Sequence, residues 1–120
     1  MKTTLTELFA YRQYIGIPIS YFFDRKTYSF CEGSFLPTME DSPYPRYIPL
    51  FQIDQEKIQE MYILQKNEGH IQQEFLACNC CFEEFIQRKG LWNDWWSYYR
   101  LSVYQLAKHW CEKHSIKYEI

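Results

Sequence analysis

Strand-forming residues gather in the first half of the chain, whereas the second half spaces its apolar residues as helices do. Between Ile19 and Cys31, β-branched and aromatic residues flank the polar turn Asp24–Thr27, a pattern that predicts a β-hairpin. Tyr47–Leu50 has the same character and predicts a third strand. Because proline has no N–H to donate to a neighbouring strand, we expect Pro49 at the end or at the edge of that strand.

Three further segments complete this part of the pattern. Residues 3–13 carry apolar side chains at helical spacing, and Thr4 or Thr6 is available as N-cap, which predicts a short first helix. The segment Glu32–Pro45 contains three prolines and one glycine, so we expect a surface loop without regular structure. The last five residues, 116–120, alternate between apolar and polar side chains and predict a final strand.

Two helical patterns follow in the second half. Asp54 is placed to cap a helix that closes at Asn67–Gly69. Its predicted apolar face consists of Ile58, Met61, Tyr62 and Gln65. Apolar residues then recur every three or four positions, which predicts either one helix over 70–88 or two helices separated at Asn79, since Asn tolerates the left-handed conformation at a helix end. Lys89–Gly90 ends this pattern.

The last helix has the clearest pattern in the chain. It begins near Trp92 and ends at Ser115, with apolar residues on one stripe and charged residues off it. The residues of this stripe, which we expect to be buried, are Trp92, Trp95, Trp96, Tyr99, Val103, Leu106 and Trp110. Tyr98, Leu101 and Tyr104 fall on the other side of the same helix, so more than half of its circumference is apolar.

This order of elements predicts an α+β fold. We expect a short N-terminal helix and an antiparallel β-hairpin, extended to a three-stranded sheet, packed against a C-terminal helical half with one long aromatic-rich helix. The 120 residues have room for a single α+β domain over residues 1–120, since one core uses about 100–150 residues. Aromatic residues make up 20% of the chain, and their large surface favours a dense core.

Charge and composition disfavour several classes of function. The formal net charge is -2 and neither half of the chain is basic, so it lacks the positive stripe that binds nucleic acid phosphates or anionic membranes. No apolar run approaches the roughly 20 residues that span a bilayer. Polar residues interrupt the apolar positions of the N-terminus, unlike those of a secretory signal. We therefore expect a cytoplasmic protein that binds neither nucleic acid nor a membrane.

The aromatic motifs follow an order that is found in a known family. They are the strand motifs Tyr21–Asp24 and Tyr28–Phe30, the segment Tyr47–Pro49, the pair Phe82 and Phe85, and the Trp-Trp-x-Tyr-Tyr run at 95–99. Over roughly residues 18–118 the chain resembles the uncharacterised bacterial protein family number 158. The resemblance implies a small bacterial α+β protein of no assigned activity, and it transfers no catalytic residue. Where that family carries small residues and glycines between two helices, this chain carries Cys78–Cys81, which favours a helix break there.

Cysteine and histidine provide the candidate metal and thiol chemistry. The five cysteines are odd in number and crowded, so they do not suggest a disulfide framework, and we expect reduced thiols. Four residues have the types and spacing of a tetrahedral zinc site and are called the Cys3His set here: Cys78, Cys81, Cys111 and His114. Because they lie in helical patterns among aromatic residues, we expect thiols of the core or its margin, with no bound metal and no cofactor.

No group of residues in the sequence indicates catalysis. Glu56 and Glu60 share a helix face but lie opposite its apolar stripe, where they are expected to face water. Tyr and Trp dominate interface hot spots, so we predict a non-catalytic interaction domain that binds a protein partner or a second copy through Tyr98, Leu101 and Tyr104. The alternative is a small zinc- or thiol-dependent protein centred on the Cys3His set. An RNA-binding module that stacks bases on tyrosines is disfavoured by the charge balance.

Overall fold

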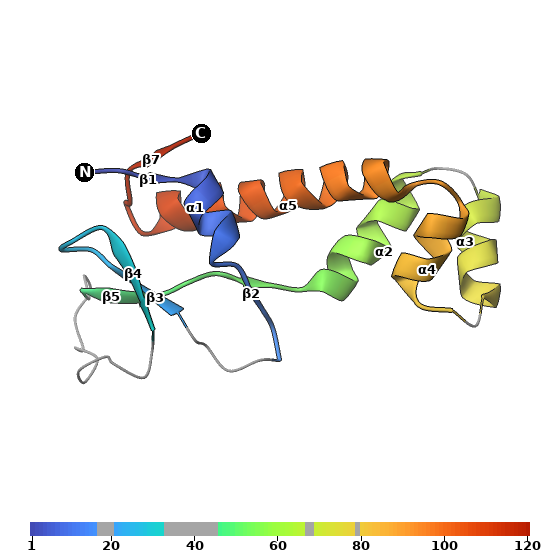
Figure 1. Ribbon diagram of the computed structural model, residues 1–120, viewed down its shortest axis with the longest axis horizontal. Helices are drawn as coiled ribbons and strands as arrows, with labels where there is room; N and C mark the ends of the chain where they lie inside the picture. Colours follow the sequence, from blue (N-terminus) through green and yellow to red (C-terminus); the bar gives the residue numbers. More distant parts are fainter. Residues whose placement is uncertain (17–20, 33–45, 67–68, 79) are drawn as a thin grey trace. The chain divides into compact units, whose positions relative to one another are not determined.

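Figure 1 shows the chain in a computed structural model, which describes residues 1–16, 21–32, 46–66, 69–78 and 80–120. The fold is α+β, as the sequence predicts, with a short N-terminal helix, a three-stranded antiparallel sheet and a helical second half. The elements are β1 (Thr3–Thr4), α1 (Leu5–Ala10), β2 (Gln13–Tyr14), β3 (Tyr21–Asp24), β4 (Ser29–Glu32), β5 (Tyr47–Pro49), β6 (Gln52–Ile53), α2 (Gln55–Gln65), α3 (Gly69–Ala77), α4 (Phe82–Arg88), α5 (Trp92–Lys113) and β7 (Tyr118–Glu119). Residues 33–45 of the predicted loop lie outside the described residues.

Contacts within the chain divide it into two compact units. Residues 1–53 and 103–120 form one unit, which we call the sheet unit because it contains all the described strands. Residues 54–102 form the other, the helical unit, with α2, α3 and α4. The helix α5 is continuous, and its first half belongs to the helical unit while its second half belongs to the sheet unit.

The predicted hairpin is present in the sheet unit. Strands β3 and β4 pair antiparallel with Phe23 opposite Phe30, and β5 pairs with the other edge of β3 with Ile48 opposite Phe23. The strand order β4-β3-β5 makes β5 an edge strand, and Pro49 is its last residue. The predicted third strand and the place of its proline are therefore confirmed. On the outer side of β5, no described strand lies where it would need a hydrogen bond from the N–H that Pro49 lacks.

Two short parallel pairs complete the sheet unit. Strand β1 pairs with β7, with Thr3 opposite Tyr118, and β2 pairs with β6, with Gln13 opposite Gln52. The first pair places the two ends of the chain side by side (Figure 1). The predicted final strand is thus confirmed, whereas β1, β2 and β6 were not predicted. Each has only two residues, too few for an alternating pattern to identify.

The core of the sheet unit is built around Trp110 of α5. Its indole Nε1–H donates to the Pro49 carbonyl oxygen at 3.1 Å, and its ring lies edge-on to Phe23 with 5.8 Å between centroids. Helix α1 packs against the same cluster and is capped by Thr4, whose hydroxyl accepts from the Glu7 N–H at 3.1 Å. The buried residues of this cluster are Leu5, Leu8, Phe23, Ile48, Leu50, Ala107, Trp110, Cys111 and Ile116.

The helical unit begins with α2, which Asp54 caps as predicted by accepting a hydrogen bond from the Lys57 N–H at 3.1 Å. The pattern over 70–88 forms two helices, α3 and α4, separated by residues 78–81. The residue Gly90 follows α4 with a φ of 69°, a left-handed conformation that glycine adopts without a steric penalty. The end of the pattern at Lys89–Gly90 is therefore confirmed.

The buried face of α2 differs in part from the predicted one. Ile58 and Tyr62 are buried as predicted, and Ile63 is buried with them. Met61 and Gln65 are exposed, so the prediction is wrong for these two residues. The spacing of apolar residues predicts that one face of the helix is buried, but it does not fix the exact limits of that face. In the structure, Tyr62 packs against the rings of Trp95 and Tyr98 in α5, and the buried face is centred on it.

The buried stripe of α5 is narrower than predicted. Its buried residues are Trp95, Tyr99, Val103, Ala107, Trp110 and Cys111. The prediction is wrong for Trp92, Trp96 and Leu106, each of which is 38–40% exposed. Adjacent residues of a helix point about 100° apart. The buried residues of α5 follow one another mostly at intervals of four, so a residue next to one of them in sequence lies at the edge of the buried stripe.

Helix α5 has 22 residues, and about 20 residues are long enough to cross a bilayer. Its sequence nevertheless contains charged residues at both ends and in the middle, among them Asp94, Arg100 and Lys113. Within the described parts of the chain, no helix combines the length and the hydrophobicity of a membrane span.

An ion pair stabilises the hairpin at the Asp24 end of β3. The Arg46 guanidinium donates from Nε and Nη2 to the two carboxylate oxygens of Asp24, each at 3.0 Å, and the Lys26 N–H donates to Oδ1 at 2.9 Å. Asp24 is buried, at 6% exposure. The hydrogen bonds from Arg46 outweigh the effect of burial and lower the pKa of Asp24 to about 2.

This pair predicts a loss of stability in acid. The pKa of Asp24 is lower in the folded chain than its ordinary value of 3.8, so its contribution is present above that value and disappears as the pH falls toward 2. Between pH 5 and pH 2 we expect the native chain to lose about 1–2 kcal/mol more stability than the Arg46→Gln variant, which lacks the guanidinium. Urea unfolding at both pH values measures the difference. Equal losses would show that the pair does not lower the pKa of Asp24.

The neighbouring tryptophans of α5 provide a second prediction. Trp95 is 3% exposed, with ring centroids 4.7 Å from Phe82 and 5.2 Å from Tyr62, whereas Trp96 is 38% exposed. We expect Trp95→Ala to lower the free energy of unfolding by about 3–5 kcal/mol, because it leaves a large cavity. The matched variant Trp96→Ala should lower it by about 1 kcal/mol. Chemical denaturation of both variants measures the difference, and equal effects would place both rings in the core.

Candidate functional site

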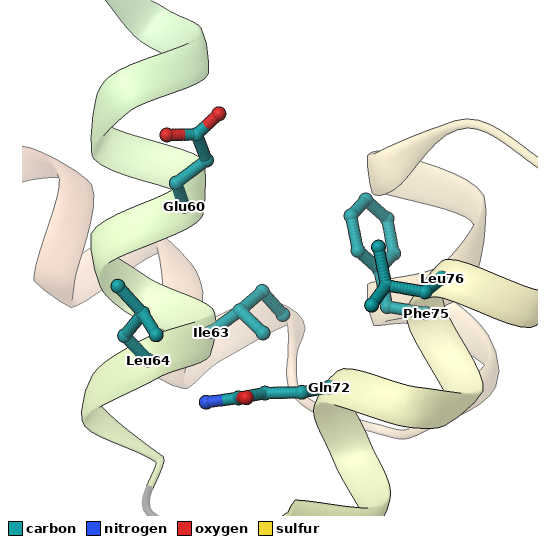
Figure 2. A pocket seen from close by; sticks show the side chains of 6 residues that line it. All are labelled: Glu60, Ile63, Leu64, Gln72, Phe75 and Leu76. Carbon is teal, nitrogen blue, oxygen red and sulfur yellow. The ribbon is translucent and has the colours of Figure 1, made fainter.

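A groove lies between α2 and α3 within the helical unit (Figure 2). Its volume is about 330 Å³. Three residues of each helix line it: Glu60, Ile63 and Leu64 of α2, and Gln72, Phe75 and Leu76 of α3. Figure 2 shows Phe75 and Leu76 across the groove from α2, and Gln72 extending from α3 toward α2. Two helices therefore form its opposite walls.

Aromatic packing fixes the inner part of the groove. Ile63 is buried and Phe75 is half-buried. The Phe75 ring lies with its centroid 5.8 Å from that of Phe82 and 5.3 Å from that of Phe85, so α3 is packed against α4 at this point. Side chains in such ring clusters are well ordered by their neighbours. The inner wall is therefore preformed.

The outer part of the groove carries exposed leucines. Leu64 is 58% exposed and Leu76 is 82% exposed. Burying a leucine side chain is favourable by about 1.5–3 kcal/mol. A ligand that covers the two exposed leucines would therefore gain free energy of binding from their burial. Among the lining residues that the structure describes, Glu60 is ionisable and Gln72 is polar but neutral. The described lining is thus mostly apolar, with one carboxylate and one amide at its margin.

A partly buried hydrogen bond joins α2 to α5 in the helical unit. The Tyr62 hydroxyl donates to Oδ2 of Asp94 at 2.7 Å, and the Lys66 ammonium pairs with the same oxygen. The Tyr62 ring lies 5.2 Å from Trp95 and 5.3 Å from Tyr98 between centroids. Burial, together with the hydrogen bond to Asp94, raises the pKa of Tyr62, and hydrogen bonds from Lys66 and Tyr62 lower the pKa of Asp94. Neither group changes its protonation near neutral pH, so this trio holds the two helices together.

The three residues predicted to bind a partner differ in exposure. Leu101 is 61% exposed. Tyr98 is half-buried against Tyr62 in the helical unit, and Tyr104 is half-buried in the sheet unit, where its ring lies edge-on to Phe9 at 5.5 Å. Leu101 is therefore the most accessible of the three, while each tyrosine presents part of its surface to solvent.

The cysteines between α3 and α4 are not equivalent. The structure joins Cys78 and Cys80 in a disulfide, and Cys81 remains a free, exposed thiol. The expectation of reduced thiols is therefore wrong for Cys78 and Cys80. Their Cα atoms lie 5.4 Å apart at the helix break, a separation that a disulfide can bridge, whereas the same spacing inside a continuous helix would point the side chains apart.

The other half of the Cys3His set belongs to the sheet unit. Cys111 is buried, and burial raises the pKa of its thiol to about 11. The His114 ring lies 5.4 Å from Trp110, and burial lowers the pKa of His114. Among the residues that the structure describes, no three His, Cys, Asp or Glu side chains are grouped so that they could hold a metal ion.

The sequence contains a signal for the groove in two leucines that lie off the apolar stripes of their helices. Leu64 and Leu76 both fall outside the predicted apolar faces of their helices. An apolar residue off the predicted stripe either widens the buried face, as Ile63 of α2 does, or faces solvent or a second surface. Leu64 of α2 and Leu76 of α3 are two such residues, and both line the groove.

The hydrogen bond of Tyr62 predicts a specific effect on stability. Tyr62→Phe keeps the buried ring but removes the hydroxyl that donates to Asp94, so we expect a loss of about 1 kcal/mol in the free energy of unfolding. Tyr98→Phe is the matched control, because the Tyr98 hydroxyl makes no hydrogen bond to any residue that the structure describes, and little change is expected. Thermal and urea unfolding of both variants provide the measurement. A loss in the control as large as that in Tyr62→Phe would contradict the assigned role.

In comparison with known proteins, no family model, curated protein or solved structure matches the chain. The resemblance to the uncharacterised bacterial family number 158 therefore stays a prediction.

Proposed function

We propose that this chain is a non-catalytic protein-interaction domain whose helical unit binds an apolar segment of a partner. The observation that carries the proposal is the groove between α2 and α3, with a preformed inner wall and two exposed leucines at its outer part. Helix-binding domains use grooves of this kind, in which apolar side chains of an amphipathic helix enter at intervals of one turn. The open outer wall suits a helix laid along it better than a small molecule, which binds where most of its surface is enclosed.

Charge indicates the chemistry of the partner. The helical unit, residues 54–102, contains eight Asp and Glu against five Lys and Arg. Glu60 lines the groove, and Glu56 lies one turn before it on the same exposed side of α2. An acidic border favours a partner with positive charge beside its apolar residues, because complementary charges speed encounter and orient binding. The proposed occupant is an amphipathic helix with Leu on one face and Lys or Arg on the other.

The exposed face of α5 is a second candidate contact surface for the same function. The 61% exposure of Leu101 favours it, and Tyr98 and Tyr104 flank Leu101 at one-turn intervals on the helix. Tyrosine combines a large apolar surface with a hydroxyl and is enriched where proteins bind one another. A second copy of this chain is the occupant considered for this face, since an apolar face can bury itself against its own symmetry mate.

We also propose that this protein is cytoplasmic. Its support is the odd and uneven set of five cysteines, which does not resemble the paired framework of small secreted domains. The absence of a basic face in the sequence also favours a protein partner over nucleic acid.

A model peptide tests the groove. The probe is a short amphipathic helical peptide of Leu and Lys, and its binding is followed by fluorescence anisotropy. We expect Leu64→Gln with Leu76→Gln to weaken binding by at least about tenfold, because the two apolar contacts are lost while helix propensity is kept. Leu101→Gln changes the other candidate surface, at a leucine whose exposure is close to that of Leu64, and binding through the groove leaves this variant with the affinity of the native chain.

Charge provides the second arm of this experiment. A peptide of Leu and Glu with the same pattern should bind more weakly than the Leu and Lys peptide, and Glu60→Gln should reduce that preference. Binding that is unaffected by the two groove substitutions would overturn the groove as the contact surface. If Leu101→Gln alone weakens binding, or abolishes self-association in sedimentation experiments, the contact surface is the face of α5.

A further inference from the structure

Three cysteine sulfurs lie within four residues, in the segment that joins α3 to α4. Cys78 and Cys80 share a disulfide, and Cys81, the next residue along the chain, carries a free thiol. Cys81 is exposed, whereas Cys78 and Cys80 are half-buried. A disulfide and an accessible thiol in adjacent residues are the two reactants of thiol–disulfide exchange.

Backbone hydrogen bonds hold the segment at both of its ends. The Cys78 N–H donates to the Phe75 carbonyl oxygen at 3.2 Å, and the Cys81 carbonyl oxygen accepts from the Phe85 N–H at 3.1 Å. The side chain of Cys81 makes no capping hydrogen bond to α4, so its thiol is not engaged by the helix. Cys78 and Cys81 have the Cys-x-x-Cys spacing at which redox-active disulfides close in other proteins.

The remaining thiols lack this combination of exposure and a neighbouring disulfide. Cys111 is fully buried in the core of the sheet unit, and burial raises its pKa to about 11. Cys31 is half-buried, its thiol donates to the Phe22 carbonyl oxygen, and burial raises its pKa as well. The thiolate is the attacking species in exchange, so neither residue is a good nucleophile. Among the three free cysteines, Cys81 is the accessible one.

We infer that Cys78, Cys80 and Cys81 form a thiol–disulfide exchange site whose substrates are low-molecular-weight thiols of the glutathione class. In the first step the Cys81 thiolate attacks Sγ of Cys78. A bond between Cys78 and Cys81 forms as the bond between Cys78 and Cys80 breaks, and the released electron pair stays on Cys80. Cys80 then takes up one proton, matching the one that Cys81 lost, so this step involves no net oxidation.

The first step moves the disulfide from a half-buried sulfur to an exposed one. An external thiolate then attacks Cys81, which forms a mixed disulfide and releases Cys78 as a thiolate. A second external thiol attacks the mixed disulfide and leaves as the oxidised dimer. In the net reaction, two thiols lose two electrons and two protons, and the disulfide of the chain gains them to become two thiols. This inference is independent of the groove and of its occupant.

Differential labelling of the whole 120-residue chain tests the exchange. Free thiols are blocked with N-ethylmaleimide, the protein is reduced, and the newly freed thiols are labelled with iodoacetamide. One tryptic peptide, residues 67–88, contains all three cysteines, and fragment masses locate each label. We expect the free-thiol label to be shared between Cys80 and Cys81, while Cys78 remains in a disulfide.

Variants separate the steps. Cys80→Ser should form a disulfide between Cys78 and Cys81. Cys81→Ser should keep the original disulfide and lose it to glutathione on the order of tenfold more slowly than the native chain, because the exposed sulfur is absent. Cys31→Ser removes a thiol of the sheet unit and should leave both the label distribution and the reduction rate unchanged. Circular dichroism verifies that each variant is folded, and non-reducing electrophoresis excludes disulfides between chains.

Several results would overturn the inference. One is a free-thiol label that stays on Cys81 alone after prolonged incubation, since the disulfide would then be static. Another is labelling of all three cysteines as free thiols after oxidation in air. Failure of Cys80→Ser to form the new disulfide, or equal reduction rates for Cys81→Ser and the native chain, also contradicts it.

Discussion

The burial of one aromatic stripe along α5 is the constraint on which both units depend. In the helical unit, Trp95 packs against Tyr62 and Phe82, and these rings fix α2 and α4. In the sheet unit, Trp110 packs against Phe23 and hydrogen-bonds to the backbone of β5. A continuous helix thus supplies the central indole of two separate cores. The groove and the cysteine segment both lie in the unit that Trp95 holds together.

Local chemistry made much of the fold predictable. The caps at Thr4 and Asp54, the hairpin and the edge position of Pro49 depend on residues close in sequence, and all are present. The two parallel pairs depend instead on partners far apart in the chain, such as Thr3 and Tyr118, and they are too short to leave a pattern. Which side of α2 is buried, with Ile63 inside, is also decided by distant neighbours. The division into two units could not be predicted from the hydrophobic pattern, because the second boundary falls inside α5, where the pattern of apolar residues continues without a break.

The candidate sites were less accessible to sequence reasoning than the fold. Tyr98 and Tyr104 of α5 were predicted to bind a partner because tyrosine is common in interfaces. In the structure, part of each ring packs inside the chain, against Tyr62 and Phe9 respectively. The groove arises from the way α2 and α3 meet, which depends on Phe75 and its aromatic neighbours in α4. The helix break at 78–81 was one of two open alternatives, and the disulfide there follows from the break. A spacing-based zinc hypothesis linked residues that belong to different units.

The order of the units along the chain has a consequence for synthesis on the ribosome. The helical unit is continuous over residues 54–102, so all of its sequence is available before the chain is finished. The sheet unit is interrupted, and its N-terminal 53 residues lack β7 and Trp110 until residues 103–120 have emerged. The apolar side of the first hairpin to be made therefore stays uncovered the longest. Because unpaired strands and uncovered apolar surfaces promote aggregation, the hairpin is exposed to it during synthesis until residues 103–120 have been added.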